Sequence, residues 1–505
     1  MGWEPEIEEL RRREALAERM GGAEKIARQH ARGKLDARAR IAALVDAGTF
    51  REIGKTAGRG RYDGDGVLED LAASNFIFGR ADLNGRAAVV SADDFTVRGG
   101  AADAAIHRKF VQCEKMAHTL GLPLVRMIDG TGGGGSVKTL EDVGATYVPA
   151  VPGWGDVIRN LDTVPVVALA LGPTAGLGAA RVVASHYSIM VRGLSQLFAA
   201  GPAVVAAIGE EIDRDELGGS QVHAHNGVVD EEAEDEAHAF RLARAFLSYL
   251  PGRAGHPAPR ALTGDPADRQ EAALIDLVPR DAKQVYSMRR LLDLVVDRGT
   301  LFEMGRRWGR AAITAFARLD GWPVAVLASD PSFLGGSWDA KTSEKVERFV
   351  KLADQFRLPI VHFVDNPGFM IGRAAEATGT IRYGVQAMNA VYRATVPLAS
   401  VVVRRAYGIA GSAMSNAEGF QYRFAWPSGD WGSLPIEGGV EVAYRAELEA
   451  ADDPAAALAA IRARLDAVRS PFRTAERFGI EDIVDPRETR PRLCEFADLA
   501  WAGLF

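Results

Sequence analysis

The chain has 505 residues, of which 47% are hydrophobic and 25% charged, and its formal net charge is -7. This length exceeds what one hydrophobic core serves, so we expect two domains, and the composition excludes a disordered chain. Because acidic and basic residues are interspersed, a general nucleic-acid or anionic-membrane surface is not expected, although local basic pockets stay open.

The two cysteines, Cys113 and Cys494, are too few for a disulfide framework or a four-cysteine zinc module. The N-terminus, which begins Met1-Gly2-Trp3-Glu4-Pro5, lacks the apolar core of a signal peptide, and no segment approaches about 18 uninterrupted apolar residues. We therefore expect a cytoplasmic protein without a membrane anchor.

Residues 6–46 are rich in Glu, Arg and Ala with apolar residues at helical spacing, which predicts helices that strap the first domain. Beyond them, short β-type runs alternate with helical stretches, a pattern typical of an α/β fold with a parallel or mixed sheet. The predicted strands are residues 75–81, 86–91, 124–128, 164–171 and 187–191, and the predicted helices are residues 101–120 and 140–160.

Residues 251–259 are dense in proline and glycine, which predicts an extended linker between domains 1–257 and 260–505. The second half repeats the rhythm of the first. Its predicted strands lie within residues 313–328 and at 360–365 and 398–403, and its predicted helices are residues 343–355 and 384–393. We expect an amphipathic helix near residues 454–468, followed by a polar tail, to end the second domain.

The two halves also share short motifs in register, which indicates an internal duplication. Leu83-Asn84-Gly85 recurs 236 positions later as Leu319-Asp320-Gly321. At the same spacing, Leu122-Pro123-Leu124-Val125 and Asp129 recur as Leu358-Pro359-Ile360-Val361 and Asp365. A duplicated fold suggests two facing sites, one for each partner of a transfer reaction.

A glycine-rich turn belongs to this repeat. Gly172-Pro173 ends a predicted strand, and Gly176-Leu177-Gly178 opens a short helix whose first amides have no partner inside the helix. Such amides stabilise a developing oxyanion by about 3 kcal/mol per well-placed donor. A tight turn without a ligand explains one such loop as well, but its recurrence at Gly408-Ile409-Ala410 favours function. Duplication alone would also copy a turn without function.

A second pair of loops follows the strands at residues 124–128 and 360–365. The run Asp129-Gly130-Thr131-Gly132-Gly133-Gly134-Gly135-Ser136 has neither the lysine of a P-loop nor the glycine spacing of a dinucleotide fingerprint, so we expect a ligand-binding loop instead. Its counterpart, which contains Pro367-Gly368-Phe369, is apolar, and one side is therefore expected to hold an acyl group.

Individual polar residues leave alternatives open. His223 and His225 lack a third ligand, so no metal is predicted. Asp129 and Asp365 end equivalent strands, where they either cap the following amides or contact a substrate. Arg404-Arg405 contacts an anion or forms an ion pair at a surface or an interface.

Several blocks, in order along nearly the whole chain, resemble the carboxyltransferase (β) subunit of biotin-dependent acyl-CoA carboxylases, the propionyl-CoA carboxylase group. The blocks are Ala31-Arg32-Gly33-Lys34-Leu35 with Ala37-Arg38-Ala39-Arg40-Ile41, Asp94-Phe95-Thr96-Val97 with Gly99-Gly100, Gly201-Pro202, Glu216-Leu217-Gly218-Gly219 with His223, Asn226 and Gly227, Phe363-Val364-Asp365 with Pro367-Gly368-Phe369, and Ser470-Pro471-Phe472 with Thr474-Ala475-Glu476-Arg477-Phe478-Gly479.

The resemblance implies two tandem crotonase-like (ClpP/crotonase) domains, with acyl-CoA held by residues 1–257 and carboxybiotin by residues 260–505. It implies backbone donors at Gly176 and Leu177 for a thioester enolate, and at Ile409 and Ala410 for the biotin ureido oxygen. It implies no metal in this subunit. The substrate-binding residues would be Gly132, Gly133, Gly134, Gly178, Gly408, Ser412, Pro367, Gly368 and Phe369.

The resemblance also implies partners. The chain lacks a biotinylation site of the Ala-Met-Lys-Met type and a recognisable ATP-grasp segment, so a separate biotin carboxylase and biotin carrier subunit is expected, together with a homohexamer of this chain.

Three departures from the family pattern keep the substrate open. Leu177 and Ile409 stand where relatives usually have glycine, and Ser412 stands where an aspartate often marks short acyl chains. Leu177 and Ile409 also keep a non-catalytic assembly subunit as an alternative. A decarboxylating relative is kept as well, because such a site runs in both directions.

Overall fold

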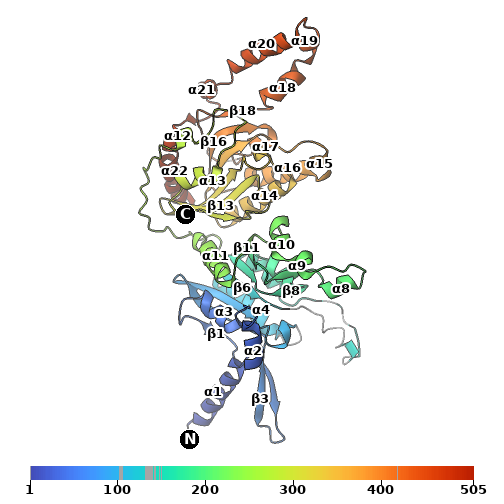
Figure 1. Ribbon diagram of the computed structural model, residues 1–505. Coiled ribbons are helices and arrows are strands. Elements are labelled where there is room, and N and C mark those ends of the chain that lie inside the picture. Colours follow the sequence, from blue (N-terminus) through green and yellow to red (C-terminus); the bar gives the residue numbers. More distant parts are fainter. Residues whose placement is uncertain are drawn as a thin grey trace. The chain divides into compact units, whose positions relative to one another are not determined.

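A computed structural model describes residues 2–101, 106–130, 140–141, 144–146, 148, 150–281, 283–417 and 419–504. The chain divides into two compact units, Met1–Ala254 and Gly255–Phe505 (Figure 1). The division falls inside the proline- and glycine-rich stretch at residues 251–259. Which ligand each half serves stays a prediction.

The first unit is built on a seven-stranded mixed sheet. Its strand order is β1 (Arg51–Glu52), β4 (Phe76–Leu83), β5 (Arg86–Asp93), β6 (Leu124–Ile128), β7 (Val166–Ala170), β9 (Tyr187–Val191) and β11 (Glu231–Ala233). Strands β1, β4 and β5 pair antiparallel, whereas the pairs from β5 to β11 are parallel. The predicted α/β fold with a mixed sheet is confirmed in this unit.

The second unit contains an eight-stranded mixed sheet of the same design. Its order is β12 (Phe302–Met304), β13 (Ala312–Leu319), β14 (Trp322–Ser329), β15 (Ile360–Asn366), β16 (Leu398–Tyr407), β17 (Tyr422–Ala425) and β19 (Asp482–Ile483), with β18 (Asp430–Gly432) beside β16. Here too an antiparallel hairpin, β13 with β14, is followed by parallel pairs.

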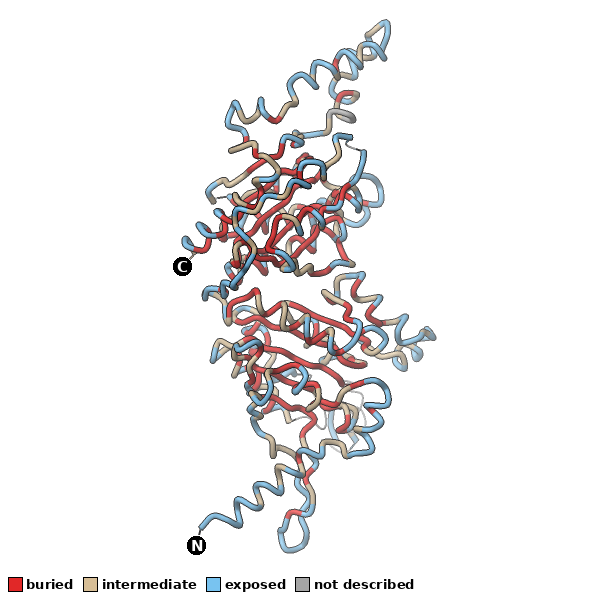
Figure 2. The backbone as a smooth tube through the Cα atoms, turned by 60° about the vertical axis from the view of Figure 1, so that its left-hand side comes forward, coloured by how far each residue is buried: buried red, intermediate tan, exposed pale blue. Residues whose placement is uncertain are grey.

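Strand residues of both sheets form the buried interior of each unit (Figure 2). In β7 all five residues are buried, and in β15 all seven. Long helices cover the sheets because one face of each is apolar: α4 (His107–Leu120) and α11 (Glu236–Tyr249) in the first unit, α14 (Ala340–Gln355) and α16 (Thr380–Arg393) in the second.

The duplication extends to the hairpin turns. Asn84 and Asp320 both adopt a left-handed conformation, with φ of 52° and 50°, and each precedes a glycine of positive φ. In the first unit the Asp46 carboxylate accepts hydrogen bonds from the amides of Asn84 and Gly85, at 3.1 and 2.7 Å.

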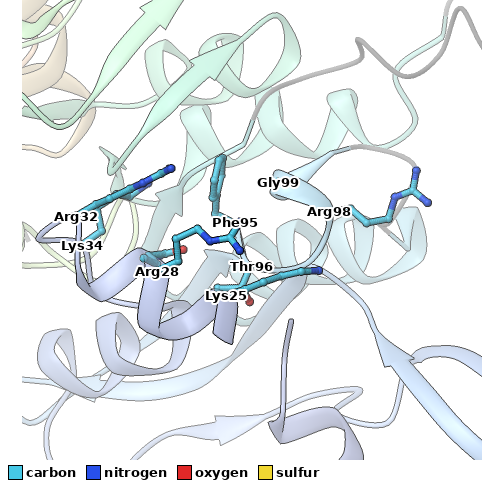
Figure 3. Close-up of a pocket in the computed structure, with 9 residues that line it drawn as sticks. Lys25, Arg28, Arg32, Lys34, Phe95, Thr96, Arg98 and Gly99 are labelled. Carbon is cyan, nitrogen blue, oxygen red and sulfur yellow. The ribbon is translucent and has the colours of Figure 1, made fainter. Parts of the chain in front are cut away.

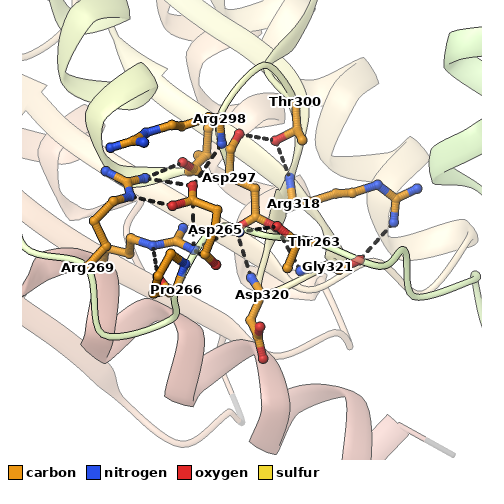
Figure 4. A network of polar contacts seen from close by, with 12 residues as sticks. Thr263, Asp265, Pro266, Arg269, Asp297, Arg298, Thr300, Arg318, Asp320 and Gly321 are labelled. Carbon is orange, nitrogen blue, oxygen red and sulfur yellow. Dashed lines mark hydrogen bonds and ion pairs between the residues drawn. The ribbon is translucent and has the colours of Figure 1, made fainter.

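An equivalent aspartate secures the hairpin of the second unit. Asp297 accepts from the amides of Asp320 and Gly321 at 3.0 and 2.7 Å, and it also pairs with Arg490 at 2.8 Å (Figure 4). The motif Asp-x-Gly-Thr that starts at Asp46 recurs at Asp297, 251 positions later. This repeat precedes the Leu83 and Leu319 motifs and has a different offset from them. It is the signal from which the duplication could have been traced further toward the N-terminus of each half.

Two predicted segments differ from the structure. The helix predicted over residues 140–160 is confirmed for residues 154–160, which lie in α6 (Trp154–Thr163). It is wrong for residues 150–153, which are not helical, and Gly153 adopts a left-handed conformation just before α6 begins. The helix predicted at 454–468 is confirmed as α20 (Pro454–Asp466). However, the predicted polar tail is wrong: residues 489–504 form α22, which buries Leu493, Phe496 and Trp501 in the core of its unit.

The predicted strap of helices is present as α1 (Glu4–Glu18), α2 (Ala23–His30) and α3 (Ala37–Leu44). An additional hairpin, β2 (Gly58–Tyr62) with β3 (Leu68–Ala73), packs beside α1 (Figure 1). Within the described residues, none of the helices has the length and apolar character needed to cross a membrane. Both cysteines are buried, and burial raises the pKa of each thiol, that of Cys494 to about 12.

Candidate functional site

The first glycine turn lies after β7, where the short strand β8 (Pro173–Ala175) pairs with β10 (Gln196–Phe198). Gly176, with φ of 58° and ψ of -121°, turns the chain into α7 (Leu177–Val183). This conformation is readily available to glycine alone. The amide of Leu177, the first of the helix, has no hydrogen-bond partner among the described residues, and the residue is 40% exposed.

Gly176 itself does not offer a free donor. Its amide donates to the carbonyl oxygen of Phe198 at 3.1 Å, because the β8–β10 pairing continues through this residue. Of the two donors expected in the first turn, the structure therefore leaves only that of Leu177 open. Gly178 follows in α7, where a Cβ would lie 2.7 Å from the Thr174 methyl group, so it serves close packing of the turn.

The second glycine turn follows β16 directly. Gly408 has a φ of 61° and begins α17 (Gly408–Ser412). Ile409 is 50% exposed and Ala410 1%, and neither amide has a partner among the residues described. Ser412 donates its hydroxyl to the carbonyl of Ile409 at 2.7 Å, which fixes the far end of the turn. The two turns thus present amides at equivalent points of the two sheets.

The apolar loop Pro367-Gly368-Phe369 borders the second turn. A Cβ on Gly368 would lie 3.7 Å from the carbonyl oxygen of Tyr407, the residue before Gly408. The amide of Gly368 donates to Asn366 Oδ1 at 2.8 Å, and the ring of Phe369 packs 6.4 Å from that of Trp338. The first-unit counterpart, which includes Gly132, Gly133 and Gly134, lies outside the described residues.

A cavity of about 310 Å³ opens beside the second turn. It is lined by Tyr392, Val402, Ala406, Gly408, Gly411, Ser412, Met414, Ser415, Arg423, Trp431, Gly432, Gly479 and Ile480. Its one guanidinium, Arg423, forms two 2.8 Å hydrogen bonds with Glu481, which raise the pKa of Arg423. Because that charge is neutralised, the cavity suits a largely apolar group with a few polar atoms.

A cationic pocket of about 290 Å³ lies in the first unit (Figure 3). It is lined by Lys25, Arg28, Gln29, Arg32, Lys34, Phe95, Thr96, Arg98 and Gly99. Within the described part of the chain, Lys25 and Arg32 have no carboxylate partner. A neighbouring hollow of about 460 Å³ shares Lys25 and Arg98 with it. Converging cations of this kind bind phosphate or carboxylate groups.

Sequence analysis did not single out this pocket. The signal was the spacing of Lys25, Arg28 and Arg32, which places three cations along one side of α2 and the turn after it, next to the Asp94-Phe95-Thr96-Val97 block. No group of three potential metal ligands exists among the described residues. His223 and His225 instead hydrogen-bond the carbonyl oxygens of Leu197 and Gln221, at 2.9 and 2.6 Å.

A family model described as the carboxyl transferase domain matches residues 28–504. The chain is 33% identical to the propionyl-CoA carboxylase carboxyltransferase subunit of Haloferax mediterranei, over 99% of this chain and 96% of that protein. It is 30% identical to the methylmalonyl-CoA decarboxylase subunit alpha of Veillonella parvula, over 96% and 94%.

A solved structure of transcarboxylase 12S, with methylmalonyl-coenzyme A and methylmalonic acid bound, superposes with a TM-score of 0.88 at 31% identity, covering 100% of this chain and 96% of that one. The fold and these likenesses define a carboxyltransferase. The resemblance predicted from the sequence motifs is confirmed. The chain belongs to the carboxyl transferase domain family, together with the β subunits of propionyl-CoA carboxylases.

Proposed function

We propose that this chain moves a carboxyl group between biotin, carried by a partner subunit, and the α-carbon or the vinylogous carbon of an acyl-CoA. The two units would be tandem crotonase-like domains, the first for acyl-CoA and the second for carboxybiotin. The observation that carries the proposal is the pair of equivalent turns, each with an exposed residue whose amide has no partner in the described chain.

The residues present fit both ligands. In the first turn, the Leu177 amide is placed to donate to a thioester oxygen as negative charge develops on it. In the second, Ile409 and Ala410 supply donors for the ureido oxygen, and the neighbouring cavity offers Trp431 and Met414 as apolar contacts for a ring. Biotin supplies, when bound, the carboxyl group and the proton acceptor, so no side-chain base is required.

Side chains at and beside the two turns would select the acyl group. Ser412, Pro367, Gly368 and Phe369 surround the second turn, and Leu177 and Ile409 project apolar side chains from the two turns. Relatives include both a propionyl-CoA carboxylase and a methylmalonyl-CoA decarboxylase, so the second candidate function is the reverse transfer, from an acyl-CoA to biotin.

Reconstitution tests this function directly. The purified chain with ATP, bicarbonate and acyl-CoA should be inert, and addition of a biotin carboxylase and carrier partner should produce carboxylated acyl-CoA from at least one member of an acyl-CoA panel. Free-biotin-dependent decarboxylation of malonyl- or methylmalonyl-CoA should occur on the chain alone. Absence of both activities, together with absence of biotin binding, would leave only an assembly role.

The cationic pocket is assigned in this proposal to the phosphates of coenzyme A. The double replacement of Lys25 and Arg32 by Ala removes two cations of the pocket that have no carboxylate partner among the described residues, and each contact to a charged group contributes about 1.5–3 kcal/mol. We expect the KM for acyl-CoA to rise at least about 10-fold, with little change in kcat. The measurement is steady-state decarboxylation with malonyl-CoA as the varied substrate.

Truncated substrates provide the control. Malonyl-pantetheine has no phosphates, so its KM should be high and equal in both proteins. As a matched change on α1, the double replacement of Arg11, which is exposed, and Arg13, which is half-buried, should leave KM unchanged; these two are paired with Glu14 and Glu9. An equal loss with both substrates in the Lys25/Arg32 variant would refute the assignment.

Assembly is the remaining part of the proposal. The solved transcarboxylase 12S structure is described as a hexamer assembly. We propose a homohexamer for this chain, and light scattering on the purified protein should give six times the chain mass. A monomer that nonetheless shows full activity would contradict it.

A further inference from the structure

A buried carboxylate lies behind each turn, and in the first unit it is Asp129, at the end of β6. Asp129 is fully buried, and its Oδ2 accepts from both Arg40 and Lys34 at 2.7 Å. Arg40 continues to Glu236 and donates to the carbonyl of Leu171 at 2.8 Å, just before Gly172. Burial works to lower the pKa of Arg40, but the two carboxylates outweigh it and raise that pKa.

Contacts tie Asp129 to the approach of the first turn. A Cβ on Gly172 would collide with Asp129 Oδ1 and lie 2.6 Å from Lys34 Nζ. A Cβ on Gly100 would lie 2.5 Å from the carbonyl oxygen of Asp129. The segment that leads into Gly176 therefore rests directly on this carboxylate, with no room between them for a side chain at residue 172.

In the second unit Asp365 occupies the equivalent position in β15, and it is also fully buried. Its Oδ2 accepts from the Tyr286 hydroxyl and the Arg404 guanidinium, both at 3.0 Å. Its Oδ1 accepts from Arg405, from the side-chain Nε at 2.6 Å and the backbone amide at 3.2 Å. Burial raises the pKa of Tyr286, as does Asp365, so that hydroxyl keeps its proton.

Asp365 lies at an irregularity of the sheet that directly precedes the second turn. Val364 pairs with Val402 and Asn366 pairs with Ala406, so three residues of β16 lie opposite Asp365 alone. A bulge of this kind leaves backbone groups without ladder partners and bends the strand. The carboxylate of Asp365 accepts a hydrogen bond from one of those amides, that of Arg405, which lies three residues before Gly408.

We propose that Asp129 and Asp365 are positioning residues, each of which sets the direction of the amides in one turn and therefore the affinity for one ligand. Asp365 does so by holding the β16 bulge, and Asp129 by supporting the segment from Leu171 to Gly172. Neither contacts a ligand, because both are fully buried. The pairing of each turn with its ligand rests on the proposed function, whereas the positioning itself does not.

Hydrogen exchange tests the positioning independently of activity. In the full-length Asp365→Asn protein, peptides covering residues 403–414 should exchange at least about 10-fold faster, whereas those covering residues 171–183 should not change. Asp129→Asn should show the opposite pattern. Unchanged exchange in the corresponding peptide, or equal acceleration in both, would overturn the proposal whether or not the protein is active.

Kinetics then tests the link to the ligands, with free biotin and malonyl-CoA varied separately. Asp365→Asn should raise the KM for biotin or lower kcat by about 10- to 100-fold while leaving the KM for malonyl-CoA unchanged, and Asp129→Asn should affect malonyl-CoA instead. Inverted or mixed effects, alongside the expected exchange pattern, would refute the ligand assignment and leave the positioning intact.

Two further variants guard against simple loss of folding. Tyr286→Phe removes a single hydrogen bond to Asp365, preserves the shape of the side chain, and should show the Asp365→Asn pattern at smaller amplitude. Asp297→Asn disrupts a comparably buried ion pair at the opposite end of the same sheet. It should lower thermal stability without changing exchange at residues 403–414 or either KM.

Discussion

Replacement of Leu177 by proline should lower kcat for carboxyl transfer about 100- to 1000-fold, because removal of one oxyanion donor costs about 2.7–4 kcal/mol in the transition state. Leu177 is the first residue of α7, and proline is well tolerated at that helical position, where the missing amide has no partner inside the helix. The amide of Gly176 cannot take over, since it donates to Phe198. Steady-state decarboxylation of malonyl-CoA with free biotin measures the effect.

Leu177→Ala is the matched control, because it removes the same side chain and keeps the amide. Its kcat should stay within a few-fold of the unaltered protein, and circular dichroism should show both variants folded. If the alanine and proline variants lose activity equally, the side chain rather than the backbone donor is responsible, and the role assigned to this turn would have to be abandoned.

Gly172→Ala should be the most destabilising single methyl addition near the first turn. The new Cβ would collide with Oδ1 of Asp129. The other carboxylate oxygen, Oδ2, is held by Lys34 and Arg40, so the side chain cannot withdraw without breaking a buried ion pair. Disruption of such a pair costs about 3–5 kcal/mol. We expect the free energy of unfolding to fall by about 3 kcal/mol or more, measured by denaturant titration.

Gly155→Ala provides the comparison, since its new Cβ meets no atom within 4 Å and lies inside α6. Alanine is favoured over glycine in a helix by about 1 kcal/mol, so this variant should be neutral or slightly more stable. If the Gly172→Ala protein is as stable as the Gly155→Ala protein, the side chains around Asp129 rearrange at little energetic cost, contrary to this prediction.

Much of the fold was predictable because the buried strands are short apolar runs bounded by turn residues. Residues 124–128 and 187–191 are strands as predicted, and the duplicated motifs indicated two similar units. The chain conformation around Gly153 and the C-terminal helix α22 could not be predicted from the sequence. The first depends on a single left-handed residue, and the second buries Leu493 and Trp501 by packing on strands far away in the sequence.

The site was predictable where it consists of consecutive residues and not where it depends on long-range pairing. The two turns were located from Gly176 and Gly408. The loss of the Gly176 amide to Phe198 depends on the pairing of β8 with β10, which no local pattern reveals. Likewise, Asp365 was recognised as a strand end, but its hold on Arg404 and Arg405 follows from a shift in strand register.

The two buried clusters are unlike in composition although they occupy matching places. Asp129 draws its cations from the N-terminal helical region, Lys34 and Arg40, whereas Asp365 takes both from the adjoining strand, Arg404 and Arg405. The two halves therefore hold their buried carboxylates with cations from different parts of the fold. Under the proposed assignment of one ligand to each turn, a mutation in one cluster is expected to change the affinity for that ligand and leave the affinity for the other unchanged. A carboxyltransferase of this design can then accept a new acyl group and keep the same biotin carrier.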